Sequence, residues 1–339
     1  MSPHEQPVVT SGAAPRAAGP DVRTGIEEYR VAFERMSAAM ETAVLGKRHQ
    51  LQLALTCLIA DGHLLLEGFP GTGKTMLARA LANVTTCTHA RIQFTPDLLP
   101  SDVTGVTVYD QHRGTFEFHR GPVFHHLVLA DEINRASPKT QSALLEVMEE
   151  GHVTVDGTTY DVPQPFMVIA TQNPVEQAGT YRLPEAQLDR FLMKVSLGYP
   201  DAQATEEMLL RSDLRDRARM VSPVATAATI VQMRGVADRV HVDRALISYV
   251  RRLAEHSRTL PEVRLGLSAR ACLAFVRSAK AWAAARGRGH VVPEDILGLA
   301  HPILCHRLLL TPEAQFGGVE VDDLVDRLLA AVPAPTDRA

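Results

Sequence analysis

The sequence predicts an α/β protein in which a parallel sheet is followed by an all-helical domain. The first observation is a set of five short apolar runs with the length and composition of buried strands. They lie at residues 63–67, 90–94, 126–130, 166–170 and 193–197. The second observation is that helical patterns separate the runs, and strands that alternate with helices indicate a parallel sheet. The third is that only helical patterns follow residue 200.

The N-terminal segment predicts a tail and then a helix. Residues 1–22 are rich in Pro, Ala, Gly and Ser, so we expect them to be disordered. They have neither the basic start nor the apolar core of a signal peptide. A helix is expected over residues 25–43, where apolar residues recur on one stripe. This stripe contains Ile26, Tyr29, Phe33, Met36 and Met40.

Two helical patterns between the strands have clear positions. One covers residues 75–84, directly after a glycine-rich loop, and the other covers residues 137–151. The second has strong end signals, because Ser137 is a good N-cap, Pro138 suits the first helical position and Gly151 suits the position after the last turn. Both helices are expected to pack on the sheet.

Two further segments interrupt this alternation and predict β-hairpins. The first insert covers about residues 103–120, and the second covers about residues 152–163. The second carries Asp156-Gly157, a dipeptide typical of a two-residue hairpin turn. The patterns alone leave open whether these hairpins are surface decoration or functional parts.

These patterns divide the chain into four parts. After the tail, residues 23–200 form the predicted α/β domain with its two inserts, and residues 201–333 form the helical domain. Residues 334–339 are expected to fray at the end of the chain.

Composition narrows the class of protein. The chain has 339 residues and a formal net charge of −4, so its overall charge gives no argument for nucleic-acid binding, although it leaves a local basic groove open. Its four cysteines are scattered without metal-ligand spacing, so reduced thiols in a cytoplasmic protein are expected. No apolar run has the length of a membrane span. The preference for arginine over lysine fits a GC-rich bacterial genome.

A glycine-rich loop after the first predicted strand indicates a phosphate-binding site. Its sequence, GFPGTGKT at residues 68–75, has the P-loop pattern G-x4-G-K-T. The glycines allow successive backbone N–H groups to point at phosphate oxygens, and the following helix adds its positive N-terminus. Lys74 is predicted to contact the β- and γ-phosphates, and the Thr75 hydroxyl is predicted to ligate Mg²⁺.

Polar residues after two later strands predict that the bound nucleotide is hydrolysed. Asp131 follows an apolar strand and can hold Mg²⁺, while Glu132 can activate the attacking water as a general base. Asn173, at the end of FMVIATQNP, can hold the same water from the other side. An acidic pair after a strand, or an Asn before a Pro, is also a common structural feature, so the prediction rests on their combination with the P-loop.

Two arginines are further candidates. Arg190 ends the segment LPEAQLDR before the fifth strand, and Arg270 lies early in a helix of the second domain. An arginine at a helix end is ordinarily a solvated side chain that the helix dipole favours. At the start of a helix a cation is mildly disfavoured, which hints at an anion near Arg270.

Taken together, the motifs resemble the AAA+ ATPases, and among them the MoxR family. GFPGTGKT is similar to its Walker A motif, and LVLADEINRASPKTQSALLEVMEEG is similar to its Walker B motif and following helix. IATQNP resembles sensor 1, LPEAQLDRF the arginine-finger segment and GLSARA sensor 2. The order and spacing of these motifs carry the resemblance, which covers about residues 25–330. The two inserts resemble the helix-2 and pre-sensor-1 inserts of this group.

The resemblance implies an AAA+ P-loop NTPase core with a five-stranded parallel sheet and a C-terminal helical lid. It implies that ATP and Mg²⁺ bind between the domains in a homo-oligomeric ring, typically a hexamer. Arg190 would act in the neighbouring subunit's site, Arg270 would contact the γ-phosphate, and Arg135 would lie at the interface. The implied metal ligands are Thr75 and Asp131. The implied nucleotide-binding residues are Gly46, Gly68, Phe69, Pro70, Gly71, Thr72, Gly73, Lys74, Thr75, Met76, Asp131 and Arg270, with Val44 to Gly46 near the adenine.

MoxR-like proteins typically act as chaperone-like remodelers with a partner that carries a von Willebrand factor A domain. They help client proteins to mature, assemble or receive a cofactor. A DNA-dependent AAA+ motor and the motor subunit of a metal chelatase are the alternatives. A catalytically dead binding module is disfavoured because the expected catalytic residue types are present. A small-molecule phosphotransferase would explain neither Arg190 nor the helical domain.

Overall fold

The computed structural model describes residues 20–69, 71–172, 181, 183–210 and 216–335. Its centre is a five-stranded sheet in the order β2-β5-β8-β1-β9, with every neighbouring pair parallel. The strands are β1 (His63–Glu67), β2 (His89–Gln93), β5 (Leu127–Asp131), β8 (Met167–Gln172) and β9 (Phe191–Ser196). This confirms the predicted α/β class and its parallel sheet.

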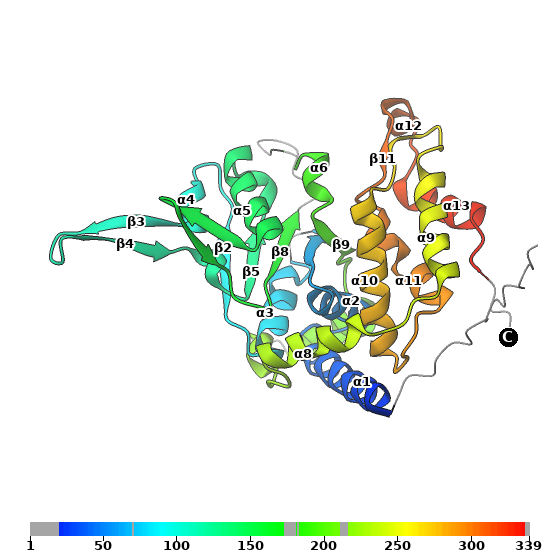
Figure 1. Cartoon of the computed structure of the whole chain (residues 1–339), viewed down its shortest axis with the longest axis horizontal. Helices are drawn as coiled ribbons and strands as arrows, with labels where there is room; N and C mark the ends of the chain where they lie inside the picture. The colour runs from blue at the N-terminus through cyan, green and yellow to red at the C-terminus, as the bar shows by residue number, and fades with distance from the viewer. Residues whose placement is uncertain (1–19, 70, 173–180, 182, 211–215, 336–339) are drawn as a thin grey trace, which may run out of the picture.

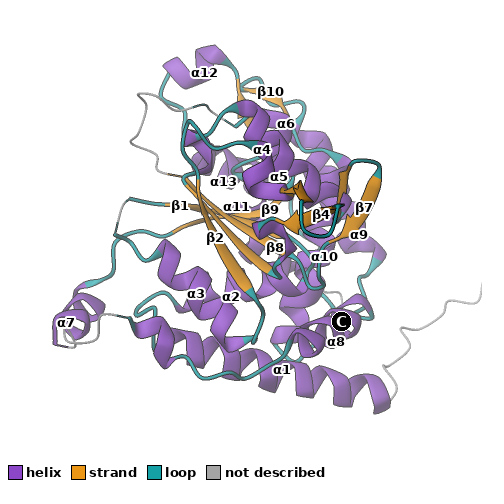
Figure 2. Cartoon of the chain, turned by 90° about the vertical axis from the view of Figure 1, so that its left-hand side faces the viewer, coloured by secondary structure: helices purple, strands orange, loops and turns teal. Residues whose placement is uncertain are grey.

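The strands alternate their side chains between two hydrophobic cores. Leu64 and Leu66 of β1 belong to one core, and Leu65 belongs to the other. The first core packs beneath α1 (Pro20–Glu41), α2 (Arg48–Ile59) and α3 (Lys74–Val84). The second packs beneath α4 (Pro100–Thr104) and α5 (Pro138–Glu150). Helices therefore cover both faces of the sheet, as Figure 2 shows, which is why the inner strands β5, β8 and β1 are largely apolar.

The first helix starts earlier than the composition suggested. It begins at Pro20, inside the stretch expected to be tail, and a proline suits a first turn because that position needs no N–H donor. The Tyr29 hydroxyl of α1 donates to the carbonyl oxygen of Ala281, far along the chain, at 3.0 Å. The helix therefore ties the α/β domain to the helical one.

Both predicted inserts are antiparallel hairpins, and they touch each other. The first pairs β3 (Gly105–Asp110) with β4 (Thr115–Arg120) and projects away from the sheet (Figure 1). The second pairs β6 (His152–Val155) with β7 (Thr158–Asp161) between α5 and β8. The rings of Phe118 and Tyr160 stack between the two hairpins with centroids 4.5 Å apart.

Short elements connect the sheet strands. They are η1 (Pro122–Phe124), η2 (Ile133–Arg135) and α6 (Glu185–Leu188). The chain then enters the lid through α7 (Ala202–Leu210) and η3 (Arg217–Met220).

The lid is mainly helical. Its helices are α8 (Ala227–Asp238), α9 (Arg244–Ser257), α10 (Ala269–Ala285), α11 (Pro293–Leu304), α12 (Pro312–Phe316) and α13 (Val321–Ala331). A short antiparallel pair, β10 (Val263–Leu265) with β11 (Leu309–Leu310), adds strand structure that the helical patterns did not predict. Lid residues such as Phe275 and Leu299 join the same core as α1 and α2, so the lid packs closely on the α/β domain.

The length and composition of the helices bear on membrane insertion. Within the described ranges, no helix combines the length and the apolar character that crossing a bilayer requires.

Candidate functional site

The P-loop follows the carboxyl end of β1 and forms an open backbone cradle. Gly71 and Gly73 have φ angles of 80° and 94°, a left-handed region that glycine adopts without strain. Among the described residues, no atom would lie within 4 Å of a Cβ at either position, so their space is available to a ligand. At Gly68, by contrast, a Cβ would lie 2.8 Å from the carbonyl oxygen of Leu197. Pro70, also expected in this site, lies outside the described residues.

Two side chains of the P-loop donate hydrogen bonds to carbonyl oxygens of the loop itself. The Lys74 ammonium donates to the carbonyl oxygens of Gly68 and Phe69, at 2.5 and 3.0 Å. The Thr72 hydroxyl donates to the Phe69 carbonyl at 2.9 Å. Thr75 and Met76 follow in the first turn of α3, whose N-terminus carries a partial positive charge. The lysine and the helix start thus converge on the cradle, as binding of phosphate requires.

Asp131 lies at the end of β5 and is 8% exposed. Its Oδ1 accepts from the Thr171 hydroxyl of β8 at 2.6 Å, and its Oδ2 accepts from the Arg91 guanidinium of β2 at 2.7 Å. The same Thr171 hydroxyl accepts the backbone N–H of Glu132 at 2.9 Å. Residues of three strands thereby fix the carboxylate at the carboxyl edge of the sheet, where β8 separates β5 from the P-loop strand β1.

Glu132 follows in a strained backbone conformation. Its φ of 56° is uncommon for a residue with a side chain and costs on the order of 1 kcal/mol or more, a type of strain that collects at functional sites. Its Oε2 accepts from the Gln93 amide at 3.0 Å and from the Arg135 guanidinium at 2.9 Å. The turn therefore sets the carboxylate at the rim of the sheet, where a water molecule can reach it.

A second set of contacts lies on the side of the loop that faces the lid. Gly46 has a φ of 67°, and a Cβ there would lie 2.9 Å from the Cβ of Ala204 in α7. The rings of Phe69 and Tyr199 stack with centroids 5.5 Å apart, and Lys47 donates to the Tyr199 carbonyl oxygen at 2.8 Å. These contacts place Gly46 where the P-loop side of the sheet meets the start of the lid.

These residues fit ATP and Mg²⁺. The glycine cradle leaves room for phosphate, and Lys74 supplies the matching charge. Asp131 offers a carboxylate, and Thr75 a hydroxyl, of the oxygen type that Mg²⁺ prefers. Asn173, expected to help hold the attacking water, lies outside the described residues.

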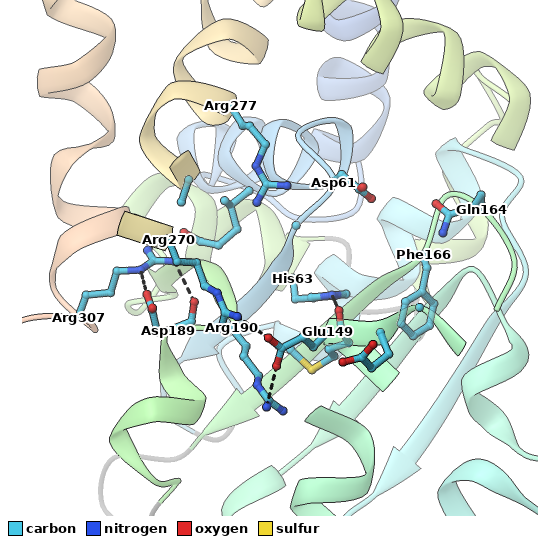
Figure 3. Close-up of a pocket in the computed structure, with 16 residues that line it drawn as sticks. Asp61, His63, Glu149, Gln164, Phe166, Asp189, Arg190, Arg270, Arg277 and Arg307 are labelled. Carbon is cyan, nitrogen blue, oxygen red and sulfur yellow. Dashed lines mark hydrogen bonds and ion pairs between the residues drawn. The ribbon is translucent and has the colours of Figure 1, made fainter. Parts of the chain in front are cut away.

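Arg190 and Arg270 meet at a different place. Both guanidinium groups form ion pairs with Glu149 of α5; the Arg190 contact measures 2.7 Å, and Arg270 donates to the other carboxylate oxygen (Figure 3). They line a cavity of about 310 Å³ together with Arg277 and Arg307. The structure therefore brings the two predicted arginines together, one from each domain.

The segment that carries Arg190 is anchored to the lid. The preceding residue, Asp189, accepts from the Arg307 guanidinium at 2.7 Å and from the Ser268 hydroxyl at 2.9 Å. The Arg307 side chain is only 3% exposed, and it also donates to the Leu192 and Phe191 carbonyl oxygens. Burial lowers the pKa of Arg307, and the Asp189 carboxylate acts against that shift. The lid and the start of β9 therefore form one unit.

The arginine cavity lies at the amino edge of the sheet, opposite the P-loop. His63, the first residue of β1, lines the cavity, whereas the P-loop follows Glu67, the last residue of that strand. Five residues of strand span about 16 Å. In this structure Arg270 thus does not reach the P-loop of its own chain, because the lid packs against the amino edge.

A buried histidine belongs to the same edge. His63 Nδ1 accepts the Val168 N–H at 3.0 Å, and Nε2 donates to the Met148 carbonyl oxygen at 3.0 Å. Burial lowers its pKa to about 4, although the Met148 carbonyl acts against this shift. The neutral ring thus joins the starts of β1 and β8 to the end of α5, next to Glu149.

Sequence reasoning missed several residues of both edges. Arg91 and Gln93 of β2 contact Asp131 and Glu132. The alternation of apolar and polar residues in β2 indicates an edge strand, but it does not predict these contacts. Glu149 is one acid among several in α5, and its pairing depends on residues distant in sequence. The Asp189–Arg307 pair likewise had no local signal.

Comparisons with known proteins agree with this geometry. Residues 63–193 match the model of the "ATPase family associated with various cellular activities (AAA)", and residues 255–328 match the model of the AAA lid domain. The chain is similar to "Uncharacterized protein YeaC" of Bacillus subtilis, 46% identical over 87% of this chain and 92% of the relative. It is also similar to "Chaperone MoxR1" of Mycobacterium tuberculosis, 36% identical over 98% of this chain and 90% of the relative.

A solved structure shares the arrangement of both domains. The crystal structure of a candidate ATPase from Cytophaga hutchinsonii matches with a TM-score of 0.86 and 37% sequence identity. The match covers 93% of this chain and 98% of that chain. The relatives thus extend across the sheet, the inserts and the lid, and the likeness is not confined to the P-loop.

Proposed function

This chain belongs to the MoxR-type AAA+ ATPases, and from that premise we propose that it hydrolyses ATP in a ring whose active sites are each shared by two copies. The observation that carries the proposal is the separation of the catalytic groups. The phosphate cradle and the acids lie at the carboxyl edge of the sheet, and the paired arginines lie at the amino edge.

The carboxyl edge binds the nucleotide and positions water. The loop backbone and Lys74 hold the phosphates, which requires the lysine to exchange its carbonyl contacts for phosphate oxygens. Thr75 and Asp131 would hold Mg²⁺, which would neutralise phosphate charge. Glu132 acts as the general base, and Asn173 holds the water from the other side. Gly46 lies near the adenine.

The amino edge completes the site of the neighbouring copy. Arg190 and Arg270 are held on one carboxylate, so phosphate oxygens can take the place of Glu149 without a large rearrangement of either side chain. Arginines supplied in this way stabilise the charge of the transition state. Because Asp189 is anchored to the lid, a movement of the lid would move both arginines together. Arg135 lies beside Glu132 and would face the interface.

We further propose a chaperone-like role in the cytoplasm, where ATP is available. A relative of similar length is named a chaperone, which supports remodeling of protein clients. The hairpin β3–β4 exposes apolar side chains, among them Phe116 at 74%, and thus offers a surface that a protein could cover. A partner with a von Willebrand factor A domain would link the ring, typically a hexamer, to clients that need maturation or metal insertion.

Capture from native cells tests this role. A Glu132→Gln protein held in ATP should retain partner and client, because it binds nucleotide without turning it over. Lys74→Ala is the matched control that cannot reach the ATP state. Retention of protein partners by Glu132→Gln alone supports remodeling. Retention of DNA and nucleases would instead indicate a DNA motor, and particles no larger than one chain by light scattering would contradict the ring.

A further inference from the structure

A cluster of four side chains joins two helices of the lid and includes none of the residues described above at either edge of the sheet. His301 and Cys305 lie one turn apart at the end of α11, and Asp322 and Asp326 lie one turn apart on α13. The two helices lie side by side (Figure 1). His301 Nδ1 is 3.0 Å from Asp322 Oδ1, and Cys305 Sγ is 3.4 Å from that oxygen and 3.8 Å from His301 Nδ1.

These three distances fit a tetrahedral metal ion. Zinc binds imidazole nitrogen and carboxylate oxygen at about 2.0–2.2 Å and thiolate sulfur at about 2.3 Å. Ligand atoms around such an ion therefore lie roughly 3.3–3.7 Å apart. The three observed separations fall within about half an ångström of that range without any rearrangement of the helices.

Asp326 holds the imidazole from its other side. His301 Nε2 lies 2.9 Å from Asp326 Oδ1, so the ring can donate Nε2–H to that carboxylate and turn Nδ1 toward Cys305 and Asp322. A carboxylate that orients a metal-bound histidine in this way is a usual feature of zinc sites, because it fixes the tautomer and raises the basicity of the ligand.

A plain surface ion pair would explain only part of this cluster. A protonated imidazole between two carboxylates accounts for His301, Asp322 and Asp326, which are all partly or largely solvent-exposed. In that network the Cys305 thiol is only a weak hydrogen-bond donor to Asp322, although its sulfur faces both the nitrogen and the oxygen. Histidine, cysteine and aspartate side chains that converge on one point form a ligand set suited to zinc-type ions and not to magnesium or calcium.

We propose that His301, Cys305 and Asp322 bind one zinc-type divalent ion that fastens α13 to α11, with Asp326 as the positioning residue. The fourth coordination position faces solvent, where the Asp322 side chain is 72% exposed, and takes a water molecule. Metal ligation requires a thiolate and a free imidazole nitrogen, so the ion displaces the thiol proton and the Nδ1 proton, and both pass to solvent.

Cobalt tests this site on the full chain without nucleotide. Cobalt(II) in a tetrahedral site with a thiolate ligand gives strong visible bands and a near-ultraviolet sulfur-to-cobalt absorption, and zinc should remove both by competition. The magnesium site at Thr75 and Asp131 supplies only oxygen ligands and gives neither signal. We expect one equivalent of cobalt to saturate the bands.

Variants separate coordination from packing. Cys305→Ser should abolish the sulfur-to-cobalt absorption, and Cys272→Ser, which changes another partly exposed lid cysteine, should leave it intact. Asp326→Asn should weaken cobalt affinity about 10- to 100-fold while keeping the spectrum, because it removes only the orienting carboxylate. Absence of the sulfur absorption in the folded parent protein, or its persistence in Cys305→Ser, would overturn the proposal.

Discussion

The carboxyl edge of the sheet holds an acidic, phosphate-binding half of the site, and the amino edge holds an arginine-rich half. Asp131 and Glu132 lie at the carboxyl edge, as do the glycine cradle and Lys74. At the amino edge, Arg190 and Arg270 share Glu149. In the shared site proposed above, the described residues of both edges act together on the transferred phosphoryl group. The comparison teaches that one folded chain carries the two proposed half-sites about one strand length apart.

The largest effect is expected where the carboxyl edge is broken. Glu132→Gln should lower kcat by about 10²- to 10⁴-fold, because an amide cannot act as a base, while ATP binding persists. Steady-state phosphate release and nucleotide binding measure the two quantities separately. Glu146→Gln, an exposed acid on α5, serves as the control and should change neither. Turnover within about threefold of the parent protein would remove Glu132 from the role of base.

Breaking the amino edge should spare nucleotide binding and still remove activity. Arg190→Ala should reduce kcat by about 10³-fold, the size expected for an arginine donated to the transition state, and Arg270→Ala by a smaller factor. Arg251→Ala, an exposed arginine of α9, is the control. A rise in the dissociation constant of ATP for the isolated chain would instead place Arg190 in its own nucleotide site.

The buried His63 of the amino edge should make the free energy of unfolding depend on pH. Burial lowers the pKa of His63 to about 4 in the folded chain, whereas a histidine in the unfolded chain has a pKa of about 6.5. Between these two pH values, the unfolded chain therefore binds a proton that the folded chain does not. The contribution of His63 to the free energy of unfolding is therefore fully present above about pH 6.5, and it is lost as the pH falls toward 4. Between pH 7 and pH 5 the free energy of unfolding should fall by about 2 kcal/mol from His63 alone.

His306, buried against the Phe191 carbonyl oxygen with a lowered pKa, adds to the same trend. Urea unfolding at a series of pH values measures the slope. It should become shallower in His63→Gln and remain unchanged in His112→Gln, which alters an exposed histidine of the first hairpin. Equal slopes in the parent protein and His63→Gln would show that the amino edge does not depend on a neutral His63.

A milder change tests how the arginines are positioned. Glu149→Gln removes the charge that both arginines share but keeps an oxygen acceptor, so activity should fall by about tenfold or less. The loss should be smaller than that of Arg190→Ala in the same assay. An equal loss would mean that Glu149 takes part in the reaction itself.

The smallest effect concerns the joint between the domains. Tyr29→Phe removes the hydroxyl that bonds to the Ala281 carbonyl oxygen and should lower the free energy of unfolding by about 1 kcal/mol, without changing kcat. Tyr109→Phe, in the exposed hairpin, should have no measurable effect on unfolding. A loss of activity in Tyr29→Phe would show that the joint also controls the arginines.

Local patterns predicted the sheet and the P-loop edge well. Strands buried on both faces are continuous apolar runs, so β1 was predicted to the residue and the other strands to within two residues. The Walker-type motifs follow strands directly, so a few consecutive residues are enough to recognise them in the sequence. The short β10–β11 pair was missed because a two- or three-residue strand has no period to detect.

The contacts at the amino edge could not be predicted from local sequence patterns. Glu149, Asp189 and Arg307 acquire their meaning from contacts between segments far apart in the chain, which a single sequence does not reveal. The motif around Arg270 predicted an anion nearby, and in the isolated chain that anion is the Glu149 carboxylate. Placing the arginines opposite the P-loop required the packing of the lid.

Mixing two inactive variants tests the shared site most directly. Lys74→Ala disables the carboxyl edge and Arg190→Ala disables the amino edge, so a mixed ring contains some interfaces in which both halves are intact. We predict that activity reappears on mixing, passes through a maximum at intermediate ratios and is absent from either variant alone. No activity at any ratio, in particles shown by light scattering to be mixed rings, would contradict an active site built from two copies.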